Sequence, residues 1–161
     1  DNEKKLIDKA YELIKNYPAT FEIPIDVAVD NNGIRKTVSI AELYSLNKIR
    51  DIGTETIRSY SEIIKRSGTV YMSGPPGMFE KEQFSRGTET LLKALSSTLA
   101  NTIVSGGHLT AALEKYNIKD WIDHVSTSGG ALIQYLAGKE LPLINTLVES
   151  CKRYNNGEYR D

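Results

Sequence analysis

Residues 101–113, "NTIVSGGHLTAAL", combine the composition of a strand, a glycine turn and a helix within thirteen positions. The apolar run, 102–104, has the composition of a strand and stops at a Ser-Gly-Gly corner, after which a helical apolar pattern begins at once. The same order of strand, serine with glycines, and helix occurs in "VYMSGPPGMFE" (70–80) and "VSTSGGALIQYL" (125–136). Repeated strand–turn–helix units predict parallel strands joined by right-handed helical crossovers.

The segments outside these units predict further helices and one hairpin. Residues 3–17 place apolar side chains on one helical face. Apolar residues alternate over 23–29, and the turn residues that follow predict a hairpin over 25–40. Thr54 is a candidate N-cap for a helix that ends at Gly68. Later helices are predicted over 88–99, packed through Leu91, Leu92, Leu95 and Leu99, over 108–116, over 131–137 with Gly138 as its cap, and from Pro142 onward.

These elements predict an α/β fold of the Rossmann-like kind. We expect three αβα layers with a mainly parallel sheet plus a β-hairpin, in a single partial domain over residues 1–161. The domain is called partial because the chain opens at Asp1 with a helical pattern. A parallel αβ sheet that starts on a helix is expected to have lost the strand before it, so we expect a fragment of a longer chain.

Length and charge limit the classes of protein that fit. The 161 residues are enough to bury one core, and the 40% hydrophobic and 25% charged fractions are typical of a globular domain. A net charge of −1 offers no basic field to attract nucleic acid. Neither a membrane-length apolar run nor a signal peptide is visible in the sequence. We therefore expect a cytoplasmic protein with no nucleic-acid or membrane partner.

Three side chains with reactive or stacking chemistry are interpreted as structural. Cys151 is the single cysteine, so no internal disulfide can form, and we expect it to be inert. Trp121 lies between two isoleucines and is predicted to belong to the core. His124 precedes a strand and is predicted to be structural.

The three corners are expected to lie at one edge of the sheet. The carboxyl edge of an open α/β sheet is where such folds bind ligands. Glycines let the backbone approach a ligand closely, and helix starts offer N–H groups that suit a phosphate. However, neither 68–80 nor 101–114 contains a lysine or arginine, and no complete phosphate motif is present. Either the ligand carries little charge, the cations come from another segment, or the corners are tight turns without a ligand.

Three segments together resemble phosphoglycerate kinase. They are "SGPPGMFE" followed by "FSRGTE", then "SGGHLTAALEKYNI", then "HVSTSGGALIQYLAGKELP". The family's C-terminal lobe has Asn-Gly-Pro-Met-Gly-Val-Phe-Glu with Phe-x-x-Gly-Thr, then Gly-Gly-Gly-Asp-Thr, then Ser-Thr-Gly-Gly-Gly-Ala ending in Gly-Lys-x-Leu-Pro. The match covers about residues 50–145, and residues 1–50 fit more loosely. The resemblance implies that this chain is the C-terminal portion of the nucleotide-binding lobe.

The resemblance also implies roles for individual residues. Glu80 matches the acid that receives the ribose hydroxyls, a task that suits a carboxylate because it accepts two hydrogen bonds. Gly106 and Gly107 match two of the three glycines beneath the nucleotide phosphates. Gly129 and Gly130 match the helix start that faces the transferring phosphoryl group, which makes them the implied catalytic pair. The remaining implied nucleotide contacts are Ser73, Gly74, Pro75 and Gly77 beside the nucleoside, with His108 and Leu109 after the phosphate glycines.

Departures from the family pattern bear on the metal. Ser73 stands where the family usually has Asn, and His108 with Leu109 stands where the commoner pattern has Asp-Thr. An imidazole is a poor ligand for Mg²⁺, which prefers oxygen. We therefore predict no metal ligand in this chain, with Mg²⁺ held mainly by the phosphates of ATP or ADP and by water. We predict that His108 is instead a hydrogen-bond donor at the helix start.

The resemblance implies an activity for the whole enzyme. It would transfer a phosphoryl group between 1,3-bisphosphoglycerate and ADP, giving 3-phosphoglycerate and ATP in glycolysis. The lobe that binds phosphoglycerate and the first half of the nucleotide lobe, with its phosphate-binding lysines, are absent from this chain, so we expect the fragment alone to be inactive. One alternative is a dinucleotide-binding fragment of a dehydrogenase, disfavoured because no G-x-G-x-x-G follows a strand. The other is a non-catalytic interaction module.

Overall fold

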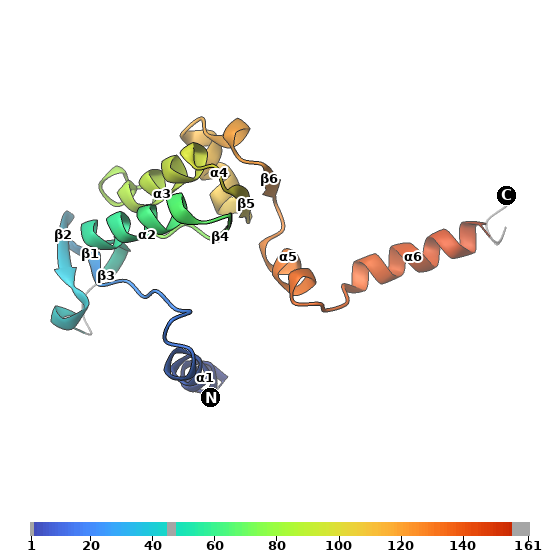
Figure 1. The fold of residues 1–161 in the computed structure, drawn as a ribbon, viewed down its shortest axis with the longest axis horizontal. Coiled ribbons are helices and arrows are strands. Elements are labelled where there is room, and N and C mark those ends of the chain that lie inside the picture. The colour runs from blue at the N-terminus through green and yellow to red at the C-terminus, as the bar shows by residue number, and fades with distance from the viewer. Residues whose placement is uncertain (1, 45–47, 156–161) are drawn as a thin grey trace.

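A parallel and an antiparallel sheet, each of three strands, organise the body of the molecule (Figure 1). A computed structural model describes residues 2–44 and 48–155. The α/β class, the parallel sheet and the hairpin predicted from the sequence are all confirmed, with the parallel and antiparallel strands in separate sheets. None of the helices in these two described ranges is long and apolar enough to cross a bilayer.

The antiparallel sheet has the order β2-β1-β3, with β1 (Asp26–Asn31) between β2 (Ile34–Ser39) and β3 (Lys48–Ile52). The predicted hairpin is β1 with β2. Its two loop residues, Asn32 and Gly33, have φ of 52° and 84°, as a type I′ turn requires. The Asp30 carboxylate holds this turn by accepting a 2.7 Å hydrogen bond from the Gly33 N–H.

The predicted alternation over residues 23–29 is wrong. Ile23 and Ile25 precede the strand, and both are 58% exposed. Val27, Ala28 and Val29 are all buried, because β1 is the central strand and has strands on both sides and helix α2 (Thr54–Arg66) against it. Strand β3 was not predicted, since three of the five residues in its sequence, KIRDI, are charged, and one of them, Asp51, is buried.

The parallel sheet has the order β4-β5-β6 and follows the predicted segments closely. Strand β4 (Thr69–Ser73) pairs with β5 (Asn101–Ser105), which pairs with β6 (His124–Ser126). The helices that connect and cover these strands are α2, α3 (Arg86–Ser97) and α4 (Gly107–Lys115). The described residues also form short 3₁₀ turns at η1 (Ile40–Glu42), η2 (Glu82–Phe84) and η3 (Lys119–Trp121).

The hydrophobic core lies among α2, α3, α4 and the parallel sheet. Apolar side chains from these elements form one buried cluster that extends from β3 to the end of η3. Two predicted core residues lie outside it, because Leu99 follows the end of α3 and is fully exposed, and Trp121 is 70% exposed on η3. Members of the cluster with almost no exposed surface are Leu92, Leu95, Val104, Leu109, Ala112 and Leu113.

Three helices keep their apolar faces uncovered by the described residues. Helices α1 (Asn2–Asn16) and α6 (Pro142–Asn155) extend away from the body, and α5 (Gly129–Leu136) lies between the body and α6 (Figure 1). Gly138, at φ 71°, ends α5 as predicted. Large apolar side chains that are 45% to 71% exposed on these helices are Leu6, Ile7, Tyr11, Ile133, Tyr135, Leu136, Leu143, Ile144, Leu147 and Val148.

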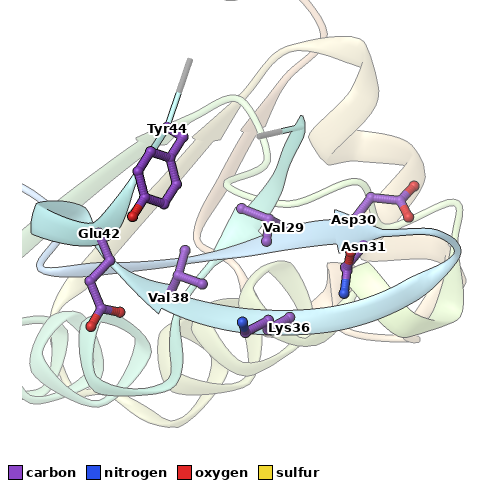
Figure 2. A pocket seen from close by; sticks show the side chains of 7 residues that line it. All are labelled: Val29, Asp30, Asn31, Lys36, Val38, Glu42 and Tyr44. Atoms are coloured by element: carbon purple, nitrogen blue, oxygen red, sulfur yellow. The ribbon is translucent and has the colours of Figure 1, made fainter. Parts of the chain in front are cut away.

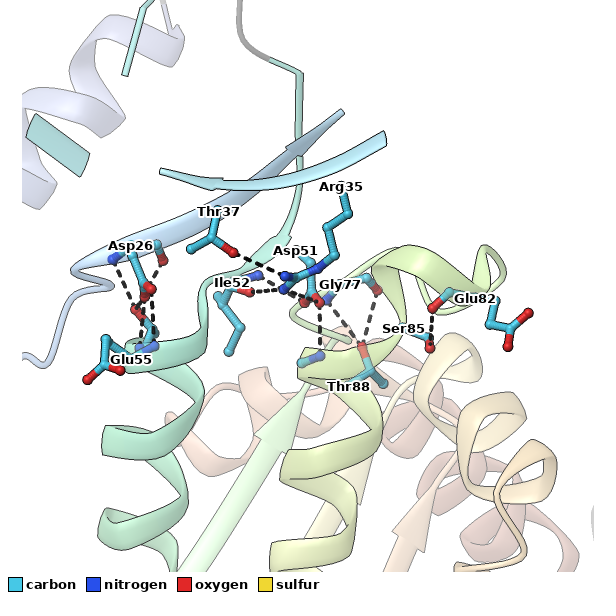
Figure 3. Close-up of polar contacts among 12 residues, drawn as sticks. Asp26, Arg35, Thr37, Asp51, Ile52, Glu55, Gly77, Glu82, Ser85 and Thr88 are labelled. Carbon is cyan, nitrogen blue, oxygen red and sulfur yellow. Dashed lines mark hydrogen bonds and ion pairs between the residues drawn. The ribbon is translucent and has the colours of Figure 1, made fainter. Parts of the chain in front are cut away.

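Asp26 joins the antiparallel sheet to the start of α2 (Figure 3). Its carboxylate accepts hydrogen bonds from the Glu55 N–H at 3.0 Å, the Thr56 N–H at 2.8 Å and the Thr56 hydroxyl at 2.6 Å. The prediction that Thr54 is the N-cap is therefore wrong: Gly53 occupies that position, and a carboxylate from β1 caps the helix. A Cβ on Gly53 would lie 2.1 Å from the Asp26 Cγ, so only glycine fits.

Asp51 makes the equivalent junction to α3. It is 1% exposed and accepts hydrogen bonds from the Gly87 N–H and the Ile52 N–H, both at 2.9 Å, and the Arg35 guanidinium lies 3.6 Å away (Figure 3). A Cβ on Gly77 or Gly87 would lie 2.2 or 2.1 Å from the Asp51 Oδ1. We call Asp26, Asp51 and the three glycines that touch them, Gly53, Gly77 and Gly87, the aspartate junction.

The pKa values of the two aspartates are shifted in opposite directions. Burial raises the pKa of the Asp26 carboxyl, but hydrogen bonds from Thr56 and Glu55 outweigh it, so the net pKa is below the ordinary value of 3.8. Burial also raises the pKa of Asp51, and its hydrogen bonds from Gly87 and Ile52 and the charge of Arg35 offset this only in part, leaving the pKa above 3.8. The junction therefore contains one carboxylate favoured by folding and one disfavoured by it.

Candidate functional site

The three serine–glycine corners meet at the carboxyl edge of the parallel sheet, as the repeated units predict. Ser73 at the end of β4 pairs with Ser105 of β5, which pairs with Ser126 of β6. The Gly106 N–H donates a 2.9 Å hydrogen bond to the Ser126 carbonyl. A Cβ on Gly129 would lie 3.5 Å from the Gly106 Cα and 3.9 Å from the Ser73 hydroxyl. We call this meeting point the glycine corner.

Two helices begin at the glycine corner without a capping side chain. Gly106, the N-cap of α4, has no side chain, and the side chain of Ser128, the N-cap of α5, does not bond to its helix. The first N–H groups of a helix have no acceptor within it and lie at its positive end. Gly106 also has φ 102° and ψ 144°, a conformation nearly restricted to glycine. The corner therefore offers backbone donors and positive potential that suit an anion.

The corner glycines have no neighbours that would exclude a side chain. A Cβ on Gly74, Gly106, Gly107 or Gly130 would meet no atom within 4 Å. Packing within the described residues therefore does not require glycine at these positions. Gly74 at φ 83° and Gly106 need glycine for their backbone conformation, but Gly107 and Gly130 do not have a positive φ. Their lack of a side chain leaves open space beside the helix starts.

The other predicted site residues lie in different environments. Glu80 is exposed on a turn after the Gly-Pro-Pro-Gly segment and follows the buried Phe79. His108 is exposed in the first turn of α4. Leu109 is fully buried in the core, so its predicted nucleotide contact could come only from its backbone. Gly77 is buried against Asp51, which gives this glycine a packing reason besides the predicted place beside the nucleoside.

Two further side-chain contacts, one beside the corner and one at the far end of α4, were missed from the sequence. The Tyr71 hydroxyl on β4 lies 2.6 Å from the hydroxyl of Ser105, the residue before Gly106, and the Ser105 side chain is completely buried. The Lys115 ammonium at the end of α4 donates a 2.6 Å hydrogen bond to the Phe79 carbonyl. Neither contact has a signal in the sequence, because each depends on the strand register or on the way α4 packs.

No metal site is built from side chains in the two described ranges, since no group of three or more histidine, cysteine, aspartate or glutamate residues is close enough to hold an ion. The nitrogen donors of His108 do not suit Mg²⁺. A cavity of about 390 Å³ lies elsewhere, on the antiparallel sheet (Figure 2). It contains no predicted site residue and is lined by Val29, Asp30, Asn31, Lys36, Val38, Glu42 and Tyr44.

Comparison with known proteins agrees with the sequence motifs. The family model described as phosphoglycerate kinase matches residues 1–139. A phosphoglycerate kinase from Methanothermus fervidus is 45% identical over 152 residues, covering 94% of this chain and 37% of the relative. One from Methanothermobacter thermautotrophicus is 43% identical over 144 residues, covering 89% of this chain and 35% of the relative. The chain thus spans just over a third of the length of these relatives.

Solved structures show the same likeness. The crystal structure of phosphoglycerate kinase from Pyrococcus horikoshii OT3 is similar with a TM-score of 0.80 and 33% identity, over 94% of this chain and 39% of that one. The structure of phosphoglycerate kinase from Coxiella burnetii gives a TM-score of 0.78 and 34% identity, over 88% of this chain and 38% of that one. These matches do not support the dehydrogenase alternative. The chain belongs to the phosphoglycerate kinase family.

Proposed function

We propose that this chain is the C-terminal portion of a nucleotide-binding lobe, which holds ADP or ATP at the glycine corner. The whole protein would then transfer a phosphoryl group between 1,3-bisphosphoglycerate and ADP, giving 3-phosphoglycerate and ATP. The observation that supports this best is the convergence of three corners and two uncapped helix starts at one sheet edge. Family membership makes the same chemistry the expected one.

The corner would act through its backbone. In this proposal the helix start at Gly106 and Gly107 binds nucleotide phosphates, and the start at Gly129 and Gly130 faces the phosphoryl group in transfer. Phosphoryl transfer depends mainly on positioning and on stabilising the charge of three equatorial oxygens. Fixed amide donors provide this without having to reorganise during the reaction.

Mg²⁺ does not fit the side chains that this chain offers at the corner. His108 provides nitrogen, whereas Mg²⁺ requires oxygen ligands in octahedral geometry. We assign the ion to the nucleotide phosphates and water, and we assign His108 the role of a donor to a phosphate oxygen or its water. On this assignment His108→Ala weakens MgADP binding, and the dependence of nucleotide affinity on magnesium concentration stays unchanged. Loss of that dependence in a magnesium titration would show that His108 binds the metal.

The nucleoside would lie along the "SGPPGMFE" segment. Glu80 is exposed on its turn and has two acceptor oxygens, which suit the two adjacent hydroxyls of a ribose. Ser73, Gly74 and Pro75 come just before it and would form the wall beside the nucleoside.

The proposal requires partners outside this chain. Segments 68–80 and 101–114 contain no lysine or arginine, so the cations that neutralise the phosphates must come from elsewhere in the whole protein. The phosphoglycerate substrate likewise needs the other lobe. The uncovered apolar faces of α1, α5 and α6 are consistent with this requirement, because other segments of the whole protein could pack on them. We therefore expect the 161 residues alone to show no turnover in a coupled assay.

The ribose contact of Glu80 provides the test. In the full-length protein, Glu80→Ala should weaken ADP binding by about 1.5–3 kcal/mol, as expected for hydrogen bonds to a charged acceptor. Binding of 2′,3′-dideoxy-ADP should hardly change, because that nucleotide lacks both hydroxyls. Glu82→Ala, which removes an exposed carboxylate from the neighbouring η2, is the matched control and should affect neither nucleotide. Equal losses for ADP and its dideoxy analogue would contradict the ribose assignment.

A further inference from the structure

Lys115 makes an unusual set of contacts for an exposed lysine. Its ammonium donates a 2.6 Å hydrogen bond to the Phe79 carbonyl and lies 5.8 Å from the centre of the Phe79 ring and 5.5 Å from that of Tyr116. Both rings are within the range of cation–π attraction. Lys65, Lys93 and Lys119, by comparison, pair with glutamate side chains on the surface. The Lys115 side chain is therefore directed at a main-chain oxygen.

That oxygen belongs to the peptide group that leads into Glu80. A peptide group is planar, so fixing the Phe79 carbonyl also fixes the plane of the Glu80 N–H and the direction of the Glu80 Cα. The rest of the turn is held from the other side, where the Met78 N–H donates to the Arg50 carbonyl at 2.8 Å and the Lys81 N–H donates to the Met78 carbonyl at 3.0 Å. Glu80 itself is exposed.

Helix α4 links this turn to the glycine corner. It begins at Gly107, beside the corner, and ends at Lys115, which binds the turn. Nine helical residues form a stiff rod of about 13 Å. Its buried residues, Leu109, Ala112 and Leu113, anchor it in the core, so both of its ends are fixed relative to the parallel sheet.

We propose that Lys115 is a positioning residue that holds the Glu80 turn in register with the glycine corner, so that one helix sets both the phosphate and the ribose contacts. The proposal rests on the proposed role of Glu80 at the ribose. It implies that Lys115 acts on discrimination between nucleotides with and without ribose hydroxyls. It does not touch the nucleotide and is not catalytic.

The test compares Lys115→Met with Lys119→Met in the full-length protein. Methionine keeps the apolar stem and removes the ammonium, and Lys119 is the control because its 3.1 Å pair with Glu114 is exposed. The measured quantity is the ratio of the Kd for 2′,3′-dideoxy-ADP to the Kd for ADP. Lys115→Met should lower this ratio about three- to tenfold, the equivalent of one hydrogen bond, while Lys119→Met leaves it unchanged. Lys115→Arg, which restores a donor, should recover most of the ratio.

Two outcomes would overturn the proposal. One is an unchanged ratio in Lys115→Met, and the other is an equal weakening of both nucleotides, which would indicate a general structural role. Glu80→Ala measured alongside separates this failure from failure of the proposed function. If Glu80→Ala lowers the ratio and Lys115→Met does not, only the positioning role is wrong. In the double variant Glu80→Ala with Lys115→Met, the ratio should fall no further than in Glu80→Ala alone.

Discussion

Glycine is used for opposite reasons at the aspartate junction and at the glycine corner. At the junction, a Cβ on Gly53, Gly77 or Gly87 would lie 2.1–2.2 Å from an aspartate side-chain atom. At the corner, a Cβ on Gly107 or Gly130 would meet nothing within 4 Å. The junction glycines are required by atoms of this chain, whereas the corner glycines leave space that nothing in the described chain fills.

This contrast separates stability from binding within one motif. "SGPPGMFE" contains Gly77, which touches Asp51, and Gly74, which has open space around it. A motif comparison cannot distinguish the two, since both are simply glycine. The geometry predicts that substitutions at the junction glycines destabilise the fold. Substitutions at Gly107 and Gly130, the open corner glycines without a positive φ, should act on the ligand and leave the fold intact, whereas Gly74 and Gly106 also need glycine for their backbone conformation.

The largest effect is expected for Gly87→Ala. The new methyl group would displace the Asp51 carboxylate and break its 2.9 Å hydrogen bond from the residue 87 N–H. Overpacking together with loss of a buried charged hydrogen bond should lower the free energy of unfolding by about 3–5 kcal/mol. Chemical denaturation of the full-length protein measures this. Gly68→Ala is the control, because a Cβ there has no neighbour within 4 Å; similar midpoints for the two variants would contradict the packing argument.

The two aspartates of the junction should change stability with pH in opposite directions. The pKa of Asp26 is lowered on folding, so its contribution to stability is present above the ordinary value of 3.8 and is lost as the pH falls through its folded pKa. The pKa of Asp51 is raised, so its contribution is present below 3.8 and is lost as the pH rises through its folded pKa.

The variant that isolates the first of these is Asp26→Asn. We expect it to lower the free energy of unfolding at neutral pH by about 1–2 kcal/mol through the weakened cap of α2. It should also flatten the decline in stability below about pH 4, where the wild-type carboxylate takes up its proton. Denaturation midpoints measured across this range test the prediction. An unchanged acid slope would show that Asp26 does not gain from its hydrogen bonds.

A small gain is expected for Gly130→Ala. Gly130 lies in the first turn of α5 without a positive φ and with open space around it, so alanine fits and has less freedom to lose on folding. The free energy of unfolding should rise by about 0.4–1 kcal/mol. A loss of stability in thermal or chemical denaturation would mean that this position is packed.

Features of this structure could be predicted from the sequence where the interacting residues are close together along the chain. The local signals were sufficient for the hairpin, where Asn32 and Gly33 supply positive φ, and for the three strand–corner–helix units, whose glycines and serines lie within a few residues. The same units correctly predicted that the corners share one edge.

The junction could not be predicted because its partners are distant in sequence. Asp26 caps α2 from 29 residues before Glu55, and Asp51 receives the N–H of Gly87 from 36 residues away. Strand β3 was missed because a charged residue, Asp51, is buried in it. The Lys115 contact with the Phe79 carbonyl has the same long-range character, since it also joins residues 36 apart.

The variant Gly107→Ala tests whether the corner glycines serve a ligand, with MgADP affinity and the free energy of unfolding measured on the same full-length protein. We expect the Kd to rise at least about tenfold, because the new methyl group would lie where phosphate approaches the helix start. We expect the free energy of unfolding to stay within about 1 kcal/mol of the wild type. Gly68→Ala, at the opposite end of β4, should change neither quantity. Wild-type affinity in Gly107→Ala, or a stability loss like that of Gly87→Ala, would show that this corner glycine does not serve a ligand.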